Sequence, residues 1–361
     1  MDGHARLLGG QAMIGWVKDR IDSFRGRGVF AATVPPMDGA LRPNTLLEQA
    51  PVLARVAAAD NLVAYRGQVL FSSGPEIHAL NPGTGATTEW RRCPTEVTAL
   101  AVAGDTLAIG LSDGSLILSG DTERTIQTLG ACITAIAQGG DGRLIVCIGS
   151  ARNPVTEWKR DLLQGGATGA VWALSVTDGT LQKLADGLSW PAGAAMLGER
   201  VVVVEAWKHR LVQLGAAPLI TDLPGYPSRL SPTPGGWWLA VFAPRNQLIE
   251  LVLREHDYRT RMMQQVDPDH WIAPSLSPSA DFNEPMQGGA IRTHGIIKPW
   301  APTRSYGLLV RLDANFQPIA SYHSRADGKF HGVTSALQLG DRVLVASRGG
   351  NAILSLSEVQ P

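Results

Sequence analysis

A short pattern recurs six times along this chain of 361 residues: a glycine, one to three mostly polar residues, then a run of strand-forming apolar residues. The six copies cover residues 67–71, 104–109, 142–146, 198–203, 236–241 and 340–345. In most copies an apolar, strand-like segment lies just upstream. Strand, tight turn and strand at a repeating interval are typical of the inner hairpin of a propeller blade. Six copies predict an all-β fold, the six-bladed β-propeller, whose loops surround a central channel.

The spacing of the copies locates two insertions. A four-stranded blade needs about 40 residues, but 56 residues separate Gly142 from Gly198 and 104 separate Gly236 from Gly340. Extra chain is therefore expected at about 151–168 in blade three and at about 254–303 in blade five. The second insertion predicts a helix over 255–265, followed by a stretch rich in Pro, Gly, Trp and His. We expect a mixed helix and loop cap over one face of the propeller.

Composition excludes several classes of function. The formal net charge is zero, with 32 basic and 32 acidic residues, which argues against nucleic-acid binding and electrostatic membrane attachment. The three cysteines are widely spaced, and no Cys-x-x-Cys occurs, so neither a zinc site nor a disulfide framework is expected. No segment resembles a signal peptide or a membrane span. The sequence therefore predicts a cytoplasmic protein.

The first 58 residues differ from the repeats. Four apolar residues at intervals of three and four predict a short helix over 11–25: Ile14, Val17, Ile21 and Phe24. This stripe is expected to pack on the propeller or on a second copy of the chain, and a membrane-surface helix is the alternative. A proline-containing leader follows, and part of it is expected to close the ring by pairing with the last blade near 350–357. The propeller itself is predicted over 59–361.

Several stretches resemble a known family. Residues 190–193, 202–210, 222–227 and 236–240 follow one another in the order found in the strictosidine synthase-like proteins, which are related to gluconolactonase, regucalcin and paraoxonase. Shorter matches occur at 161–162, 169–174 and 330–333. The resemblance implies a six-bladed propeller, and the repeats predict the same fold independently.

The positions that bind metal in such relatives differ here. Where the metal-dependent members carry an Asn and an Asp, this chain has Ala192 and Ser228. Calcium takes six to eight oxygen ligands, carboxylates among them, and Asp60 is the acidic residue left near the start of blade one. We therefore expect no metal at the inherited position and no cofactor, with calcium as a disfavoured alternative.

The catalytic residue of true strictosidine synthase is also missing. The glutamate that moves protons in that Pictet–Spengler reaction aligns with Thr334. A threonine hydroxyl is not a general base near neutral pH. The protein is therefore not expected to be a strictosidine synthase.

Residues at the blade starts are candidates for a pocket at the channel mouth. Arg229 carries a fixed charge with a planar set of donors, and beside His331 it favours an anionic ligand. Two alternatives stay open: Arg229 pairs with Asp60 or Glu205 across the channel, and His331 is a structural histidine bonded to the backbone. Further candidates for substrate binding are Asp60, Glu205 and Trp190, which stands at the start of blade four.

The cap adds its own candidates. Glu284 and His294 can form an acid and base pair over the channel, and together with His331 they are the catalytic candidates. Lys298 and Trp300 are candidates for substrate binding. The alternative is that these residues are exposed or hold the cap together.

These features favour a small-molecule enzyme, a hydrolase of lactone or ester type that acts on an anionic substrate in a capped channel. A non-catalytic propeller that binds a metabolite is the main alternative. A lyase or isomerase and a scaffold protein are further ones. Analogy of fold does not decide between them.

Overall fold

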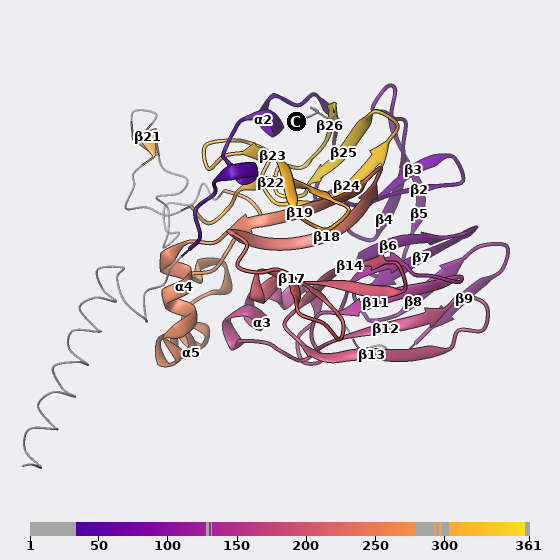
Figure 1. Ribbon diagram of the computed structural model, residues 1–361, viewed down its shortest axis with the longest axis horizontal. Helices are drawn as coiled ribbons and strands as arrows, with labels where there is room; N and C mark the ends of the chain where they lie inside the picture. The colour runs from indigo at the N-terminus through magenta and orange to yellow at the C-terminus, as the bar shows by residue number, and fades with distance from the viewer. Residues whose placement is uncertain are drawn as a thin grey trace, which may run out of the picture.

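The structure is a computed structural model, which describes residues 34–127, 130, 132–278, 292–293, 296–297 and 303–357. Six four-stranded antiparallel sheets are arranged in a ring, and Figure 1 shows them as successive blades along the chain. The fold is therefore a six-bladed β-propeller, as the glycine repeats predict.

The blades follow the order of the sequence. Blade one contains β2 (Asp60–Tyr65), β3 (Gln68–Ser73), β4 (Glu76–Leu80) and β5 (Thr87–Arg92). Blade two contains β6 (Val97–Ala103), β7 (Thr106–Leu111), β8 (Leu116–Ser119) and β9 (Glu123–Ile126). Blade three contains β10 (Ile133–Gln138), β11 (Arg143–Ile148), β12 (Gly169–Ser175) and β13 (Leu181–Leu188).

The second half of the ring repeats the plan. Blade four contains β14 (Pro191–Leu197), β15 (Arg200–Glu205), β16 (Arg210–Gln213) and β17 (Pro218–Ile220). Blade five contains β18 (Gly225–Thr233), β19 (Gly236–Pro244), β22 (Gly307–Asp313) and β23 (Pro318–Ser324). Blade six contains β24 (Val333–Leu339), β25 (Arg342–Ser347), β26 (Ala352–Ser357) and, from the other end of the chain, β1 (Val52–Arg55).

Strand β1 closes the ring. It pairs with β26, placing Val52 opposite Leu354 and Arg55 opposite Ala352. Just before it, the 3-10 helix η1 (Gly39–Leu41) and the helix α2 (Leu46–Gln49) lie along blade five, where the Asn44 side-chain amide donates to Ser321 O. The fourth strand of blade six thus comes from the segment that precedes blade one.

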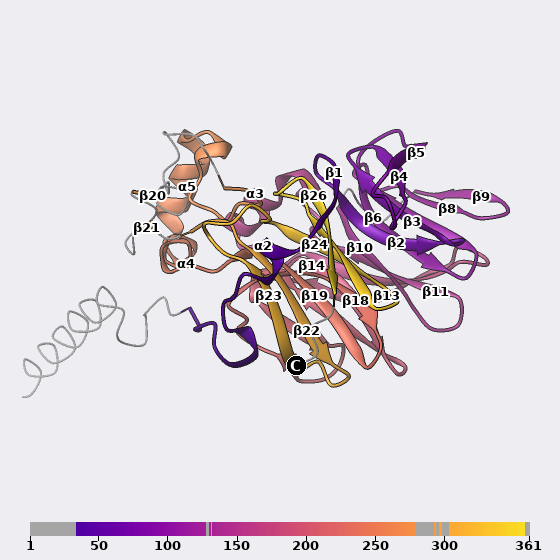
Figure 2. The ribbon, with the colours of Figure 1, turned by 90° about the horizontal axis from the view of Figure 1, so that it is seen from above.

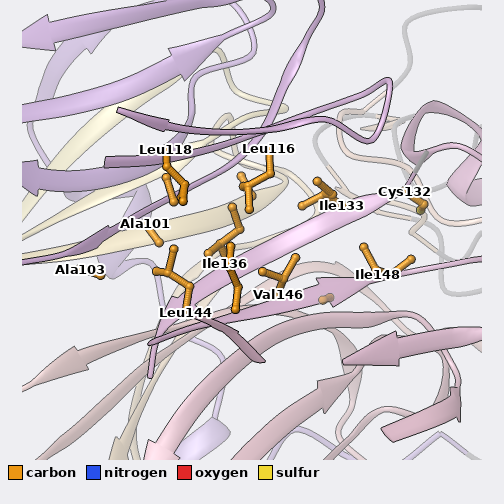
Figure 3. Close-up of a cluster of buried hydrophobic side chains, with 14 of the residues drawn as sticks. Ala101, Ala103, Leu116, Leu118, Cys132, Ile133, Ile136, Leu144, Val146 and Ile148 are labelled. Atoms are coloured by element: carbon orange, nitrogen blue, oxygen red, sulfur yellow. The ribbon is translucent and has the colours of Figure 1, made fainter. Parts of the chain in front are cut away.

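The blades hold together through apolar packing between neighbouring sheets. Figure 3 shows one such layer, in which side chains of blade two face those of blade three. Blade two contributes Ala101, Leu116 and Leu118, while Ile136 and Val146 come from blade three, and all five are buried. This packing removes apolar surface from water on both faces of each sheet.

Both insertions lie between the second and third strands of their blades, so they emerge on the same face of the ring. Blade three contributes the 3-10 helix η2 (Val155–Glu157) and α3 (Trp158–Gln164). Blade five contributes α4 (Gln247–Arg254), α5 (His256–Gln265) and the 3-10 helix η4 (Pro268–His270). In Figure 2 the helices α3, α4 and α5 gather at one end of the propeller.

The blade-five insertion is longer than the sequence predicts. Strand β19 ends at Pro244 and β22 begins at Gly307, so the insertion occupies 245–306 rather than about 254–303. The predicted helix over 255–265 is present as α5, whereas α4 and α3 are not predicted. Two short strands, β20 (Arg292–Thr293) and β21 (Ile296–Ile297), pair within the insertion. The helix predicted over 11–25 lies outside the described residues.

Candidate functional site

Each innermost strand carries a bulge near its start. The pairing registers skip residues after Asp60, Val97, Ile133, Pro191, Pro227 and Val333. A bulged residue leaves the ladder, so its carbonyl group is not used by the neighbouring strand. Leu62 is skipped as well, and we call the other skipped residues the bulge ring: Asn61, Thr98, Thr134, Ala192, Ser228, Arg229 and Thr334. These bulges place polar groups of every blade except the fourth around the channel axis.

Arg229 occupies the centre of the bulge ring. One terminal nitrogen donates to Asp60 Oδ1 at 2.9 Å and to Thr334 O at 3.2 Å. The other donates to Thr98 O at 2.7 Å and to Thr134 O at 3.3 Å. A guanidinium from blade five is thereby bound to blades one, two, three and six. Of the two partners considered for Arg229, the structure has Asp60 rather than Glu205.

The donor set at this centre does not fit a divalent cation. Asp60 is its one carboxylate, and it already faces Arg229 at 2.9 Å and Arg348 at 3.5 Å. Ala192 has no ligand atom, and the Ser228 hydroxyl donates to Thr334 O at 3.3 Å. A calcium ion here would lie against two guanidinium groups with too few oxygen ligands. Across the described part of the chain, no three or more His, Cys, Asp or Glu side chains are grouped to hold a metal ion.

A channel of about 510 Å³ begins at the bulge ring. It follows the innermost strands to the hairpin turn at Gly140 and to Pro232 near the end of β18, so it opens on the face opposite the insertions. Its wall is mostly apolar and includes Leu62, Leu100, Ala137, Ala195, Leu230 and Leu337. Such a volume and such a lining suit a small molecule.

The closed end of the channel has unused hydrogen-bonding capacity. Arg229 and Asn61 both line the channel. The Asn61 amide nitrogen donates to Ser72 Oγ at 2.8 Å, but Asn61 Oδ1 has no partner among the described residues, and neither has Arg229 Nε. Buried polar atoms without a partner are costly. Both atoms are themselves buried, whereas the Arg229 side chain as a whole is 15% exposed, so a polar group bound at this end would contact the Arg229 side chain.

Two other predicted binding residues lie away from the channel wall. Glu205 is fully buried and accepts from the Arg210 guanidinium at 2.6 Å and from Ser189 N at 2.9 Å. Trp190 stacks on Trp207 with ring centroids 4.9 Å apart. Both belong to the packing between blades three, four and five on the insertion face.

His331 has the contacts of a structural histidine, the alternative considered from the sequence. Its Nε2 lies 2.8 Å from Arg325 O and therefore carries the proton, since a carbonyl only accepts. Its Nδ1 lies 2.8 Å from Ser305 Oγ. Burial lowers the pKa of His331. With both nitrogens engaged and no exposed surface, the ring has no free atom for a substrate.

The remaining candidates cannot be placed. Glu284, His294, Lys298 and Trp300 lie outside the described residues. Before them, residues 271–278 run toward blade six, where Leu276 O lies 1.8 Å from the position of a Cβ built on Gly349. Any side chain at position 349 would therefore collide with this segment.

The bulge ring has a signal in the sequence that the glycine repeats do not include. Three blades begin with the same triplet, a β-branched apolar residue, a threonine and a small residue: Val97-Thr98-Ala99, Ile133-Thr134-Ala135 and Val333-Thr334-Ser335. The threonine is the bulged residue in each. This repeated triplet at the start of a blade predicts where the bulge ring lies.

Comparison with known proteins supports the fold. No family model and no curated protein matches the chain. A gluconolactonase from Xanthomonas campestris has a TM-score of 0.54 and 14% identity, covering 90% of this chain and 95% of that one. A luciferin-regenerating enzyme has a TM-score of 0.51 and 12% identity, covering 87% and 94%. A PQQ-bound aldose sugar dehydrogenase from Streptomyces coelicolor has a TM-score of 0.51 and 13% identity, covering 90% and 99%.

These neighbours carry different activities, so at such identities they establish the propeller fold and no reaction. They include a gluconolactonase, which agrees with the broader grouping predicted from the sequence, whereas the strictosidine synthase-like affiliation stays a prediction. The structure describes no helix of the length and apolarity needed to cross a membrane.

Proposed function

We propose that the protein binds a small molecule in its central channel, with an apolar body along the innermost strands and an oxygen-bearing head group at Arg229 and Asn61. The observation that carries this proposal is the apolar channel of about 510 Å³ that ends at the largely buried guanidinium of Arg229. The apolar wall supplies affinity in proportion to the surface removed from water. The polar end fixes the orientation of the ligand.

The charge at the closed end favours a carboxylate or a carbonyl group. Asp60 lies between Arg229 and Arg348, so the three groups together carry one excess positive charge. A hydrogen bond from a charged donor is about twice as strong as a neutral one. We therefore expect an acid to bind more tightly than an alcohol with the same chain.

Hydrolysis of a lactone or ester is the second candidate. The guanidinium at the end of the channel can polarise a carbonyl oxygen, and the fold is shared with a gluconolactonase. However, the described residues that line the channel include no His, Cys, Asp, Glu, Lys or Tyr. This part of the site offers groups that can bind a ligand but no general base. Ligand binding is therefore the first proposal and hydrolysis the second.

The test is calorimetric titration with decanoate, decanol and γ-decalactone. We expect decanoate to bind more tightly than decanol. Ala137, half-buried on β10, lines the channel, so Ala137→Trp fills it and should weaken binding at least about tenfold. Ala185 on β13 lies in the same blade outside the channel, and Ala185→Trp should bind like the parent protein.

Hydrolysis is followed in the same samples. Turnover of γ-decalactone or an aryl ester that Ala137→Trp abolishes would establish the second candidate. Addition of a chelator should leave such turnover unchanged, because the donor set around Arg229 does not fit a divalent cation. Binding that is equal in both tryptophan variants would contradict the channel as the site.

A further inference from the structure

A second concave site lies between the two insertions, away from the channel. It is a groove of about 550 Å³ with α3 on one side and α5 on the other. Beneath it the two helices share an apolar core that contains Leu163, Val252, Met262 and Trp271. The helices are therefore packed together, and the groove has fixed walls.

Three arginines line this groove. Arg152 precedes α3, Arg160 lies on α3, and Arg259 lies on α5. The backbone N–H of Arg152 donates to Ser150 Oγ at 3.1 Å, which fixes the start of its side chain. Arg259 Nη1 lies 3.7 Å from the position of a Cβ on Gly165. Residues from both insertions thus direct positive charge into one groove.

Two of these guanidinium groups are held in position. Arg160 Nε lies 2.7 Å from Glu157 Oε2, and its guanidinium carbon lies 5.0 Å from the Trp271 ring centroid. Arg259 Nη1 donates to Leu253 O at 2.9 Å. The Arg152 guanidinium has no side-chain partner among the described residues. Fixed donors lose little conformational entropy when a ligand binds.

The acidic residues near the groove leave its charge positive. Glu157 pairs with Arg160. The Asp161 carboxylate accepts from Asn153 at 2.9 Å and from the Trp207 indole at 2.8 Å, within the protein. Glu255 and Asp257 flank His256 on α5, but neither is among the lining residues. Three arginines against the carboxylates of Glu157 and Asp161 leave an excess of one positive charge.

We propose that this groove binds the phosphate groups of a small metabolite. The excess positive charge favours an anion, and the planar donors of arginine suit the oxygens of a phosphate group. The site is separate from the central channel, so either proposal can fail without the other.

The probe is inorganic pyrophosphate, titrated by calorimetry into the full chain at low salt, with acetate as the monoanionic comparison. We expect pyrophosphate to bind and acetate not to bind measurably. The double variant Arg152→Gln with Arg160→Gln should bind at least about tenfold more weakly, because it removes two positive charges and leaves only neutral donors at those positions. Raising the salt concentration should weaken the remaining binding.

Arg200→Gln is the matched control, since Arg200 is an exposed arginine at the start of β15, outside the groove. It should bind pyrophosphate like the parent protein. The single variant Arg152→Gln removes a side chain without a described partner, so it keeps the test valid if the double variant does not fold. A parent protein that does not bind pyrophosphate, or a folded Arg152 variant that binds it equally well, would overturn the proposal. Binding to vesicles containing phosphatidic acid without binding to pyrophosphate would also overturn it.

Discussion

At the scale of single residues, the Arg229 side chain bonds to more blades than that of any other described residue of the bulge ring. Its guanidinium bonds to groups of four other blades, and its side chain is 15% exposed. The charge is compensated by Asp60, which is 5% exposed. Removing one partner of a buried pair leaves the other charged without compensation.

Arg229→Met should therefore lower the free energy of unfolding by about 3–5 kcal/mol, as measured by denaturant titration. The comparison is Arg348→Met, which removes the second guanidinium near Asp60. That group is 38% exposed and 3.5 Å away, so its loss should cost at most about 1 kcal/mol. Equal effects of the two variants would contradict the central role of Arg229.

Buried histidines make stability depend on pH. Burial lowers the pKa of His323 to about 4, and its ring lies 3.0 Å from the Tyr306 hydroxyl and 2.7 Å from Ser321 Oγ. In the unfolded chain this pKa is about 6.5. Below that pH the unfolded state takes up a proton that the folded state does not, so stability is lost as pH falls from about 6.5 toward 4.

For His323 alone the loss at pH 5 relative to pH 7.5 is about 2 kcal/mol. His323→Gln should be less stable at pH 7.5 but should lose less stability between pH 7.5 and 5 than the parent protein. His256→Gln, at an exposed position, serves as the control. A His323 variant with the same pH dependence as the parent protein would show that this ring does not titrate as described.

Residue types at the blade starts could be predicted from the sequence, but their contacts could not. Asp60 and Arg229 are recognisable because the repeats locate the blade starts. His331 is recognisable in the same way, yet its partners Ser305 and Arg325 belong to another blade and another loop. Whether a histidine faces a channel or the packing between blades depends on such distant contacts.

At the scale of elements, the inner hairpins are predictable because turn and strand signals are local. The insertion helices are harder to predict. Residues 247–254 contain an apolar run that fits a strand as well as a helix. Asn246 favours the helix because it caps the N-terminus: its side chain accepts from Ile249 N at 2.8 Å. The same side chain donates to Thr303 O at 3.0 Å.

Asn246→Ala should destabilise α4 by about 1 kcal/mol or more, because it removes the N-cap and the hydrogen bond to Thr303 O. Hydrogen exchange of the amides of α4 and α5 should become faster, while that of the inner strands should not change. Asn246→Asp keeps the acceptor for Ile249 N and should restore part of the protection. Uniform protection in all three proteins would mean that the cap does not hold the helix.

At the scale of the whole molecule, stability depends on closing the ring. The closing strand β1 contacts blade one as well as blade six, because a Cβ built on Gly85 lies 1.9 Å from Leu53 O. Gly85 also has a φ of +76°. Gly74 has a φ of +58° but has no atom within 4 Å of its Cβ position. Both glycines therefore have a positive φ, but only at Gly85 would an added Cβ meet the backbone of β1.

Gly74→Ala should therefore lower the free energy of unfolding by about 1 kcal/mol. Gly85→Ala adds a clash with the backbone of β1 and should lower it by clearly more, about 2–3 kcal/mol. Thermal or denaturant unfolding of the two variants measures the difference. Equal losses would show that the closing strand does not rest against blade one in solution.

The number of blades follows from the sequence, because each blade repeats the same local signal. The position of the channel does not, because it depends on how far six bulges turn the innermost strands. The sequence therefore places candidate residues at the blade starts and in the insertion, whereas the structure has a channel that opens on the opposite face.

The most direct test is a crystal structure of the protein with decanoate or γ-decalactone. The account predicts a ligand between the six innermost strands, with its oxygen atoms within hydrogen-bond distance of Arg229 or Asn61 and its carbon chain directed toward Gly140 and Pro232. A ligand bound on the insertion face, with the channel free of it, would contradict the account.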